Sequence, residues 1–98
     1  MRVFISQPMR GLTDEQVLTV RKAAIRNVRE MYPLVDIEII VTFFNDFDGN
    51  AIQFLGKSIM KLGEADLAVF LPGWESARGC RIEHTVAVEY EIERLYIE

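Results

Sequence analysis

The stretch over residues 65–90 constrains the fold of this chain more than any other. It begins with an apolar run, 67–71, that is short enough for a buried strand, and it then turns through Pro72 and a glycine. It ends in a helical pattern that carries Glu83 in the expected first turn. A strand, a glycine-bearing loop and a helix form half of a βαβ unit. Ligands of open parallel sheets bind beyond the carboxyl ends of the strands, so we expect Glu83 to face a small-molecule site.

Three further runs of β-forming residues predict the other strands, at 2–5, 36–42 and 95–97. Helical patterns separate them, so the predicted order is βαβαβαβ. This alternation implies an α/β fold: a small open parallel sheet of about four strands with helices on both faces, a three-layer αβα arrangement of flavodoxin- or Rossmann-like type. A chain of 98 residues has the size of one domain, and we expect 1–98 to form it.

The first two helices carry start signals in the sequence. Thr13 with Gln16, and Asn50 with Gln53, have the spacing of capping boxes. A three-four spacing predicts one buried stripe in the first helix, formed by Val17, Val20, Ala24, Val28 and Met31. The second stripe is predicted to contain Ile52, Leu55, Ile59 and Leu62. The basic residues of the first helix are expected on its outer faces: Arg21, Lys22, Arg26 and Arg29.

Composition limits the function classes. A net charge of −4 disfavours binding to a nucleic-acid polymer, which normally needs a basic face. No apolar run approaches the ~20 residues of a membrane span, no signal-peptide pattern opens the chain, and the single cysteine, Cys80, cannot form an internal disulfide. We therefore expect a cytoplasmic protein without a membrane partner. Half of the residues are hydrophobic, which leaves apolar surface on so small a domain and predicts a homo-oligomer, a dimer or higher.

The loop after the first strand offers polar groups for a ligand. Its candidate binding residues are Ser6, Gln7, Met9, Arg10 and Gly11. A hydroxyl, a guanidinium and a glycine backbone before a helix N-terminus can hold an anion. The alternative is a proline–glycine turn with a surface arginine.

The other two loops offer aromatic rings. In the second loop, Phe43 or Phe44 could pack against a heterocyclic base, although phenylalanines in such a loop also suit the core or a subunit contact. In the third, Trp74 and Ser76 are candidate ligand contacts, and Gly79 permits close backbone approach.

Glu83 is the candidate catalytic residue. A carboxylate in a first helical turn is favoured in its ionised form by the helix dipole, and in a dry crevice it can attack the C1 atom of a sugar. The alternative is an acid that only stabilises the helix start. His84 points off that face and is interpreted as a surface or interface residue, and Cys80 as a small buried residue. The sequence has no metal-ligand spacing and no nucleotide-cofactor motif, so we expect neither metal nor cofactor.

At these loops the chain resembles the nucleoside 2-deoxyribosyltransferase-like superfamily, and within it a set of short bacterial and phage proteins known as a domain of unknown function. The resemblance spans nearly the whole chain, through FISQPMRG, EADLAVFLPGW and ARGCRIEHTVAVEY. It implies that Glu83 attacks the anomeric carbon to form a glycosyl-enzyme intermediate, and that Ser6, Arg10 and Gly11 face a phosphate. The superfamily usually carries an aspartate at the position of Ser58 and often an aspartate or a serine at that of Ala77. Those side chains help to position the base or to protonate it as it leaves.

The leading hypothesis is therefore cleavage or transfer of the N-glycosidic bond of a deoxynucleoside or its 5′-monophosphate. The missing acids leave two alternatives open. One is a non-catalytic module that binds a nucleotide in the same crevice, and the other is a subunit whose main role is assembly.

Overall fold

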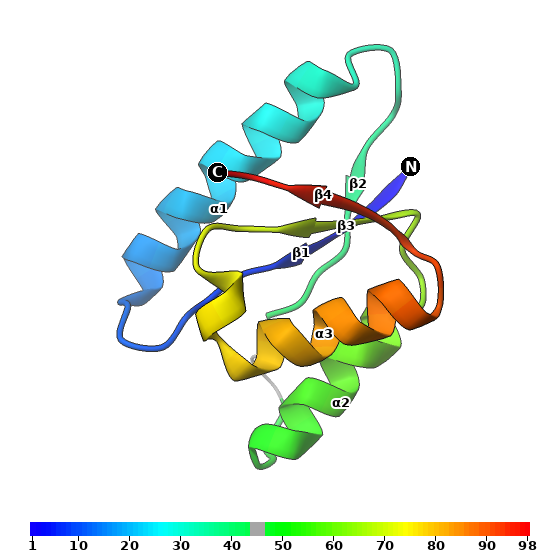
Figure 1. The fold of residues 1–98 in the computed structure, drawn as a ribbon. Helices are drawn as coiled ribbons and strands as arrows, with labels where there is room; N and C mark the ends of the chain where they lie inside the picture. Colours follow the sequence, from blue (N-terminus) through cyan, green and yellow to red (C-terminus); the bar gives the residue numbers. More distant parts are fainter. Residues whose placement is uncertain (44–46) are drawn as a thin grey trace.

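One four-stranded sheet organises the protein in the computed structural model, which describes residues 1–43 and 47–98. Its strands are β1 (Arg2–Ser6), β2 (Glu38–Ile39), β3 (Leu67–Phe70) and β4 (Glu93–Tyr96). They lie in the order β2-β1-β3-β4, and every neighbouring pair is parallel (Figure 1). The predicted small open parallel sheet is confirmed.

The helices cover both faces of the sheet, as the alternating pattern predicts. They are α1 (Asp14–Met31), α2 (Ala51–Leu62) and α3 (Arg78–Glu89), with a short 3-10 turn, η1 (Trp74–Ser76), before α3. Figure 1 shows α1 on one side of the sheet and α2 and α3 together on the other. No helix within the described residues has the length and apolar character to cross a membrane.

The two central strands, β1 and β3, hold the core together. All four residues of β3 are buried, and so are the last four of β1. Because successive side chains point to opposite faces, each strand feeds two clusters. The cluster under α1 contains Val3, Ile5, Ala24, Val28, Leu67, Val69 and Leu71. The cluster under α2 and α3 contains Phe4, Ile40, Leu62, Ala68, Phe70 and Ala87.

The strand order creates a switch point between β1 and β3. The chain leaves β1 to reach β2 on one side, and it leaves β3 to reach β4 on the other side. The two crossovers therefore diverge at the neighbouring carboxyl ends of β1 and β3, which is where open α/β sheets bind ligands. Ser6, the last residue of β1, pairs with Phe70, the last residue of β3, at this position.

The outer strands differ from their predicted bounds. β2 is limited to Glu38–Ile39 within the apolar run 36–42, and β4 is Glu93–Tyr96 where 95–97 was expected. Both are edge strands with a single neighbour. Their extent depends on pairing with that neighbour and not on local hydrophobicity alone, so the sequence pattern predicts it poorly.

The predicted buried stripes are partly wrong. In α1, Val20 and Met31 are 43% and 55% exposed, whereas Arg21, expected outside, is only 7% exposed. Positions 17, 21, 24 and 28 satisfy the three-four spacing as well as the predicted set does, so periodicity alone cannot choose between Val20 and Arg21. In α2, Ile52 is 80% exposed, because the N-terminal end of this helix projects away from the sheet (Figure 1).

Both predicted capping boxes are confirmed. The Thr13 hydroxyl accepts a hydrogen bond from the Gln16 amide at 3.1 Å, and the Gln16 side chain accepts one from the Thr13 amide at 2.9 Å. Asn50 and Gln53 make the same exchange at the start of α2.

We predict that Thr13→Ala lowers the free energy of unfolding by about 1 kcal/mol, the usual cost of losing a helix cap. Thr19→Ala is the matched control, because the Thr19 hydroxyl only donates back to the Glu15 carbonyl within the same helix. Urea unfolding measures both. A Thr13→Ala variant as stable as Thr19→Ala would contradict the assignment of Thr13 as a cap.

Candidate functional site

Two serine hydroxyls hold the carboxylate of Glu83 at the switch point. Ser6 Oγ donates to Glu83 Oε1 at 2.7 Å, and Ser58 Oγ donates to Glu83 Oε2 at 2.6 Å. Ser6 comes from β1, Ser58 from α2 and Glu83 from α3, so the three hydrogen-bonded groups join three elements. The contact between Ser6 and Glu83 spans 77 residues of sequence.

The carboxylate is buried, and burial dominates its ionisation. Glu83 is 7% exposed and Ser6 is 1% exposed. Desolvation raises the pKa of Glu83 above its ordinary value, and the hydrogen bonds from Ser58 and Ser6 offset part of this effect because they favour the ionised form. Burial also raises the pKa of the Cys80 thiol. Cys80 is 4% exposed, as expected of a small buried residue.

The position of Glu83 in its helix differs from the prediction. Because α3 begins at Arg78, Glu83 is in the second helical turn and no acid stands in the first turn. The influence of the helix dipole is greatest within the first turn, so it does not account for the state of this carboxyl group. The two serine hydroxyls supply the stabilisation of the ionised form that the sequence argument assigned to the helix dipole.

Glu83 lines a small hollow together with residues of β1, α1 and α2. The hollow has a volume of about 50 Å³, and it is lined by Ile5, Gln7, Met9, Arg21, Thr42, Phe43, Ser58 and Glu83. Of the predicted ligand contacts, the structure thus brings Gln7, Met9 and Phe43 to Glu83, with Ser6 hydrogen-bonded behind it. Glu83 is the only carboxylate among the described residues of this lining.

Arg21 is the residue of this hollow that the sequence interpretation placed wrongly. Its guanidinium donates from Nη2 to the Ile40 carbonyl at 3.3 Å and lies 5.0 Å from the centre of the Phe43 ring. Burial lowers the pKa of Arg21, but the ordinary pKa of a guanidinium is so high that the side chain remains a cation. Among the described residues, the lining of the hollow therefore contains one carboxylate and one guanidinium. The signal for Arg21 is its position four residues after Val17 and three before Ala24, both of which are buried.

The side-chain amide of Gln7 uses its nitrogen, but not its oxygen, in a hydrogen bond to a described residue. Its Nε2 donates to the Val17 carbonyl at 2.7 Å, and its buried Oε1 has no hydrogen-bond partner among the residues that the structure describes.

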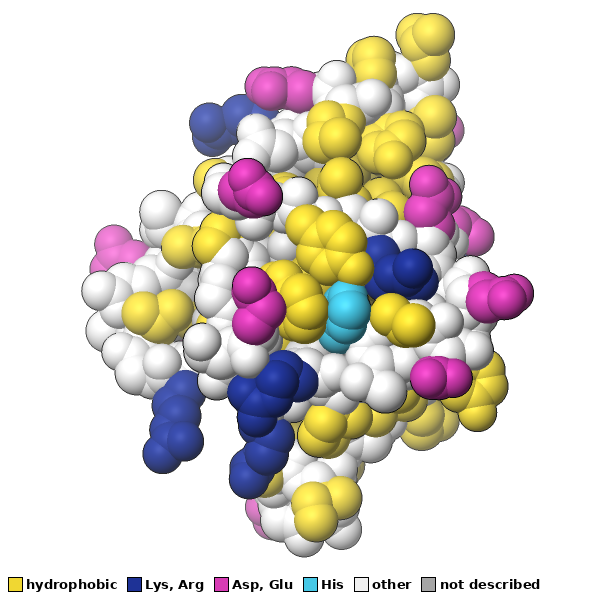
Figure 2. Space-filling view, viewed as in Figure 1, with side chains coloured by type: hydrophobic (Ala, Val, Ile, Leu, Met, Phe, Trp, Pro, Cys, Tyr) yellow, Lys and Arg dark blue, Asp and Glu magenta, His cyan; other side chains and the backbone are white. Residues whose placement is uncertain are grey.

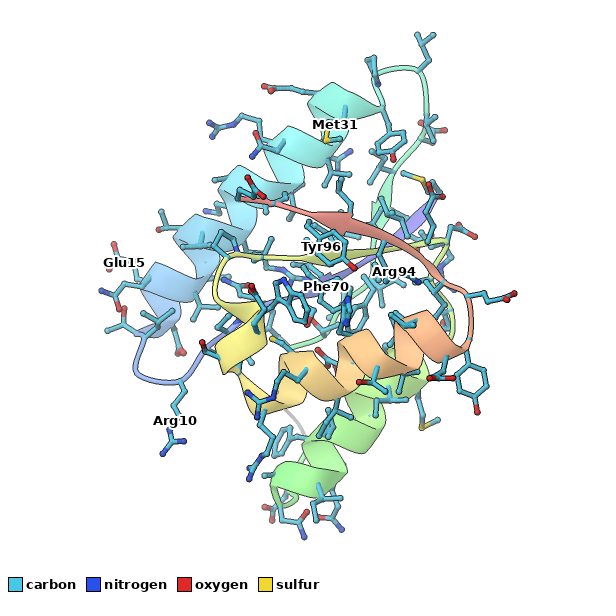
Figure 3. All side chains as sticks on the ribbon, in the orientation of Figure 1. Arg10, Glu15, Met31, Phe70, Arg94 and Tyr96 are labelled. Carbon is cyan, nitrogen blue, oxygen red and sulfur yellow. The ribbon has the colours of Figure 1, made fainter. Side chains whose placement is uncertain are left out.

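The remaining predicted contacts lie outside this lining. Arg10 is exposed and points away from the protein in Figure 3, and Gly11, with φ 81°, belongs to the same exposed turn. Ser76 is exposed on η1, and the nearest side chain to Gly79 is Leu55 of α2. Phe44 falls outside the described residues, as do Asn45 and Asp46 of the same loop.

Trp74 belongs to a separate aromatic cluster. Its ring stacks on His84 with 4.2 Å between ring centres, and His84 Nε2 is 2.7 Å from the Tyr96 hydroxyl. Figure 2 shows the single histidine among hydrophobic side chains on the face formed by α3 and β4. This face contains a second, shallower hollow that Trp74 and Tyr96 help to line, with Pro72, Gly73, Glu75, Ile97 and Glu98. The interpretation of His84 as separate from the Glu83 face agrees with this placement.

The described part of the chain holds no group of three or more His, Cys, Asp or Glu side chains that could bind a metal ion. The chemistry that this site can perform with its own residues is that of the buried carboxylate, the guanidinium and the amide.

Comparison with known proteins gives a family. The family model described as "Domain of unknown function (DUF4406)" matches residues 1–96, which is nearly the entire chain. No curated protein matches the chain.

We predict that Glu83→Gln stabilises the protein increasingly as pH rises. The pKa of Glu83 is higher in the folded than in the unfolded chain, so the stability that this group contributes is present below the unfolded pKa and is lost as pH rises through the folded pKa. Glutamine has the same shape and carries no charge to desolvate. Each 1 kcal/mol that the substitution adds to the free energy of unfolding corresponds to a rise in Tm of about 4–8 °C in a domain of this size.

Thermal unfolding between pH 4 and pH 8 measures this difference. Glu89→Gln is the matched control, since Glu89 is exposed on the same helix and surface substitutions usually change stability by less than about 0.5 kcal/mol. A difference between Glu83→Gln and the native protein that shrinks with rising pH would contradict the argument.

Proposed function

We propose, for a chain that belongs to the DUF4406 family, that the hollow at Glu83 receives the sugar of a deoxynucleoside or its 5′-monophosphate and that the chain cleaves or transfers the N-glycosidic bond. The observation that carries the proposal is the buried Glu83 carboxylate, oriented by two serine hydroxyls at the switch point of a parallel sheet. Carboxyl groups are seldom buried without a purpose beyond stability, because desolvation opposes their charge. The resemblance of ARGCRIEHTVAVEY to the deoxyribosyltransferase-like turn supports the same role for Glu83.

The reaction proceeds by displacement at the anomeric carbon. One Glu83 oxygen forms a bond to C1′ while the bond from C1′ to the base nitrogen breaks, and its electron pair leaves with the base, which takes up a proton from water. Water then attacks C1′ and the bond between C1′ and the Glu83 oxygen breaks, which releases deoxyribose, or deoxyribose 5-phosphate from a monophosphate, and the free carboxylate. The proton that the attacking water loses balances the one that the base took up. If the nitrogen of a second base attacks instead, the result is deoxyribosyl transfer.

The serine hydroxyls have a positioning role in this scheme. Ser6 and Ser58 hold the two carboxylate oxygens in place before the substrate arrives, so no rotation of Glu83 has to be frozen during the reaction. Their hydrogen bonds also favour the ionised, nucleophilic form against the effect of burial.

The size of the hollow limits how the ligand enters. About 50 Å³ is space for one or two water molecules, at roughly 30 Å³ each, and not for a nucleoside. A furanose therefore enters only when the rim opens. Met9 stands on that rim and is 53% exposed, and its unbranched side chain can change rotamer at little cost. In this proposal the base stays outside, over Met9 and Phe43, and Arg21, a cation that lines the hollow, holds a 5′-phosphate.

A second candidate function is nucleotide binding without reaction. The observation that favours it is the absence of any carboxylate besides Glu83 among the described residues that line the hollow, since Ser58 and Ala77 stand where related proteins usually carry acids. Without an acid to protonate it, the base is a poor leaving group, and cleavage of the N-glycosidic bond is slow. Tight binding with unchanged ligand after long incubation would select this function.

We predict that the protein releases free base from one or more members of a panel of deoxynucleosides and their 5′-monophosphates. Glu83→Gln should lower the rate by about 10³-fold or more, as expected when a nucleophile is removed. Chromatography of the released base measures the rate, and the mass of the intact protein detects the deoxyribosyl ester on Glu83. Glu89→Gln is the control and should retain the native rate. No release above the Glu83→Gln background would contradict the catalytic proposal.

We predict that Ser58→Ala moves the acid limb of the pH–rate profile to higher pH. Loss of a hydrogen bond to the ionised carboxylate raises the pKa of Glu83 further, and only the ionised form attacks. The profile of kcat/KM between pH 4 and pH 8 measures the shift, with Ser76→Ala, an exposed serine outside the hollow, as the control. An acid limb that stays in place or moves to lower pH would show that Ser58 does not act on the reacting carboxylate.

A further inference from the structure

The buried amide oxygen of Gln7 is an acceptor that none of the described residues uses. Gln7 is 9% exposed, and its Oε1 has no hydrogen-bond partner among the described residues. Folded proteins pair nearly all of their buried polar atoms, because an unpaired one loses its hydration without compensation. An unpaired acceptor beside a reactive carboxylate therefore points to a partner that arrives with the ligand.

The orientation of this amide is fixed by its other half. Gln7 Nε2 donates to the Val17 carbonyl at 2.7 Å. The opposite orientation would place two oxygens at that distance, where neither can donate, so the nitrogen faces Val17. Gln7 also lines the hollow that Glu83 lines. Its unpaired Oε1 is buried, so a ligand reaches it only when the rim of the hollow opens. The group that is then offered is an acceptor, and it requires a donor such as a hydroxyl.

The stereochemistry of the sugar indicates which hydroxyl this is. A nucleophile that displaces the base approaches C1′ from the face opposite the base. In a 2′-deoxynucleoside the 3′-hydroxyl projects from that same face. It is also the only sugar hydroxyl that remains when the 5′ position carries a phosphate. Two groups that line one hollow, Glu83 and Gln7, thus suit two atoms on one face of the furanose.

We infer that Gln7 Oε1 accepts a hydrogen bond from the 3′-hydroxyl of the bound deoxyribose and that Gln7 thereby determines specificity for this hydroxyl. The inference rests on the proposed function. A ligand without the hydroxyl enters the same hollow but leaves the acceptor unpaired, and such a mismatch weakens binding by about 5- to 150-fold. Sites that are built to pair with a substrate hydroxyl discriminate in this way, whereas purely apolar sites do not.

The experiment compares ligands that differ by one hydroxyl. Binding of the four 2′-deoxynucleoside 5′-monophosphates and of their 2′,3′-dideoxy counterparts is measured by calorimetry on Glu83→Gln, so that no ligand is consumed. The deoxy ligand that binds should bind at least fivefold more tightly than its dideoxy counterpart. In Glu83→Gln with Gln7→Met the preference should disappear. Adding Gln16→Met instead should preserve it, because Gln16 caps α1 outside the hollow.

The outcomes separate this inference from the proposed function. Base release by the native protein together with equal binding of deoxy and dideoxy ligands would overturn the role of Gln7 and leave the reaction standing. Neither release nor binding of any nucleotide would overturn both. If Gln7→Met does not fold, turnover of the paired ligands by the native protein decides, since kcat/KM for the dideoxy ligand should then fall at least fivefold and an equal value would refute the inference.

Discussion

The hydrogen bonds from Ser6 and Ser58 to Glu83 connect the elements on which the site depends. A parallel sheet brings the end of β1 beside the end of β3, and α3 then places a carboxylate directly over that point. Without donors, desolvation would raise the pKa of a carboxyl group buried to this degree still further. With one hydroxyl on each oxygen, it is oriented and its ionised form is partly stabilised. The contact thus combines a structural role, joining β1, α2 and α3, with a chemical one.

The sequence predicts the central part of the fold well, because burial on both faces leaves a strong signal. β1 and β3 are continuous apolar runs, and the capping boxes at Thr13 and Asn50 mark where α1 and α2 begin. The edge strands are predicted less well, since their length depends on a single neighbour. The alternation of strands and helices was sufficient to give the parallel sheet, and the parallel sheet was sufficient to bring the loops after β1 and β3 to one edge.

The sequence predicted which loops come together at the site, but not which of their side chains face it. The sequence indicated Glu83, Gln7, Met9 and Phe43, all of which line the hollow. It could not separate them from Arg10 or Trp74, which also follow the carboxyl ends of β1 and β3 but face elsewhere, because a loop has no periodicity from which a direction can be calculated. Arg21 was misplaced for a different reason. Burial of an arginine contradicts the rule that charges lie outside, and that rule fails where a charge faces a site.

The composition of the hollow argues for a ligand rather than for a structural polar cluster. A structural cluster would be expected to satisfy its own members, since a partly satisfied network is less stable than an apolar core. Here Glu83 accepts hydrogen bonds from both serines. Among the described residues, however, Gln7 Oε1 has no partner and buried Arg21 has a single hydrogen bond of 3.3 Å, and both residues line the same hollow. These groups with unused hydrogen-bonding atoms thus lie where the sheet topology predicts a binding site. Under the proposed function, the acceptor of Gln7, the cation of Arg21 and the carboxylate of Glu83 would meet the hydroxyl, the phosphate and the electrophilic carbon of one sugar phosphate.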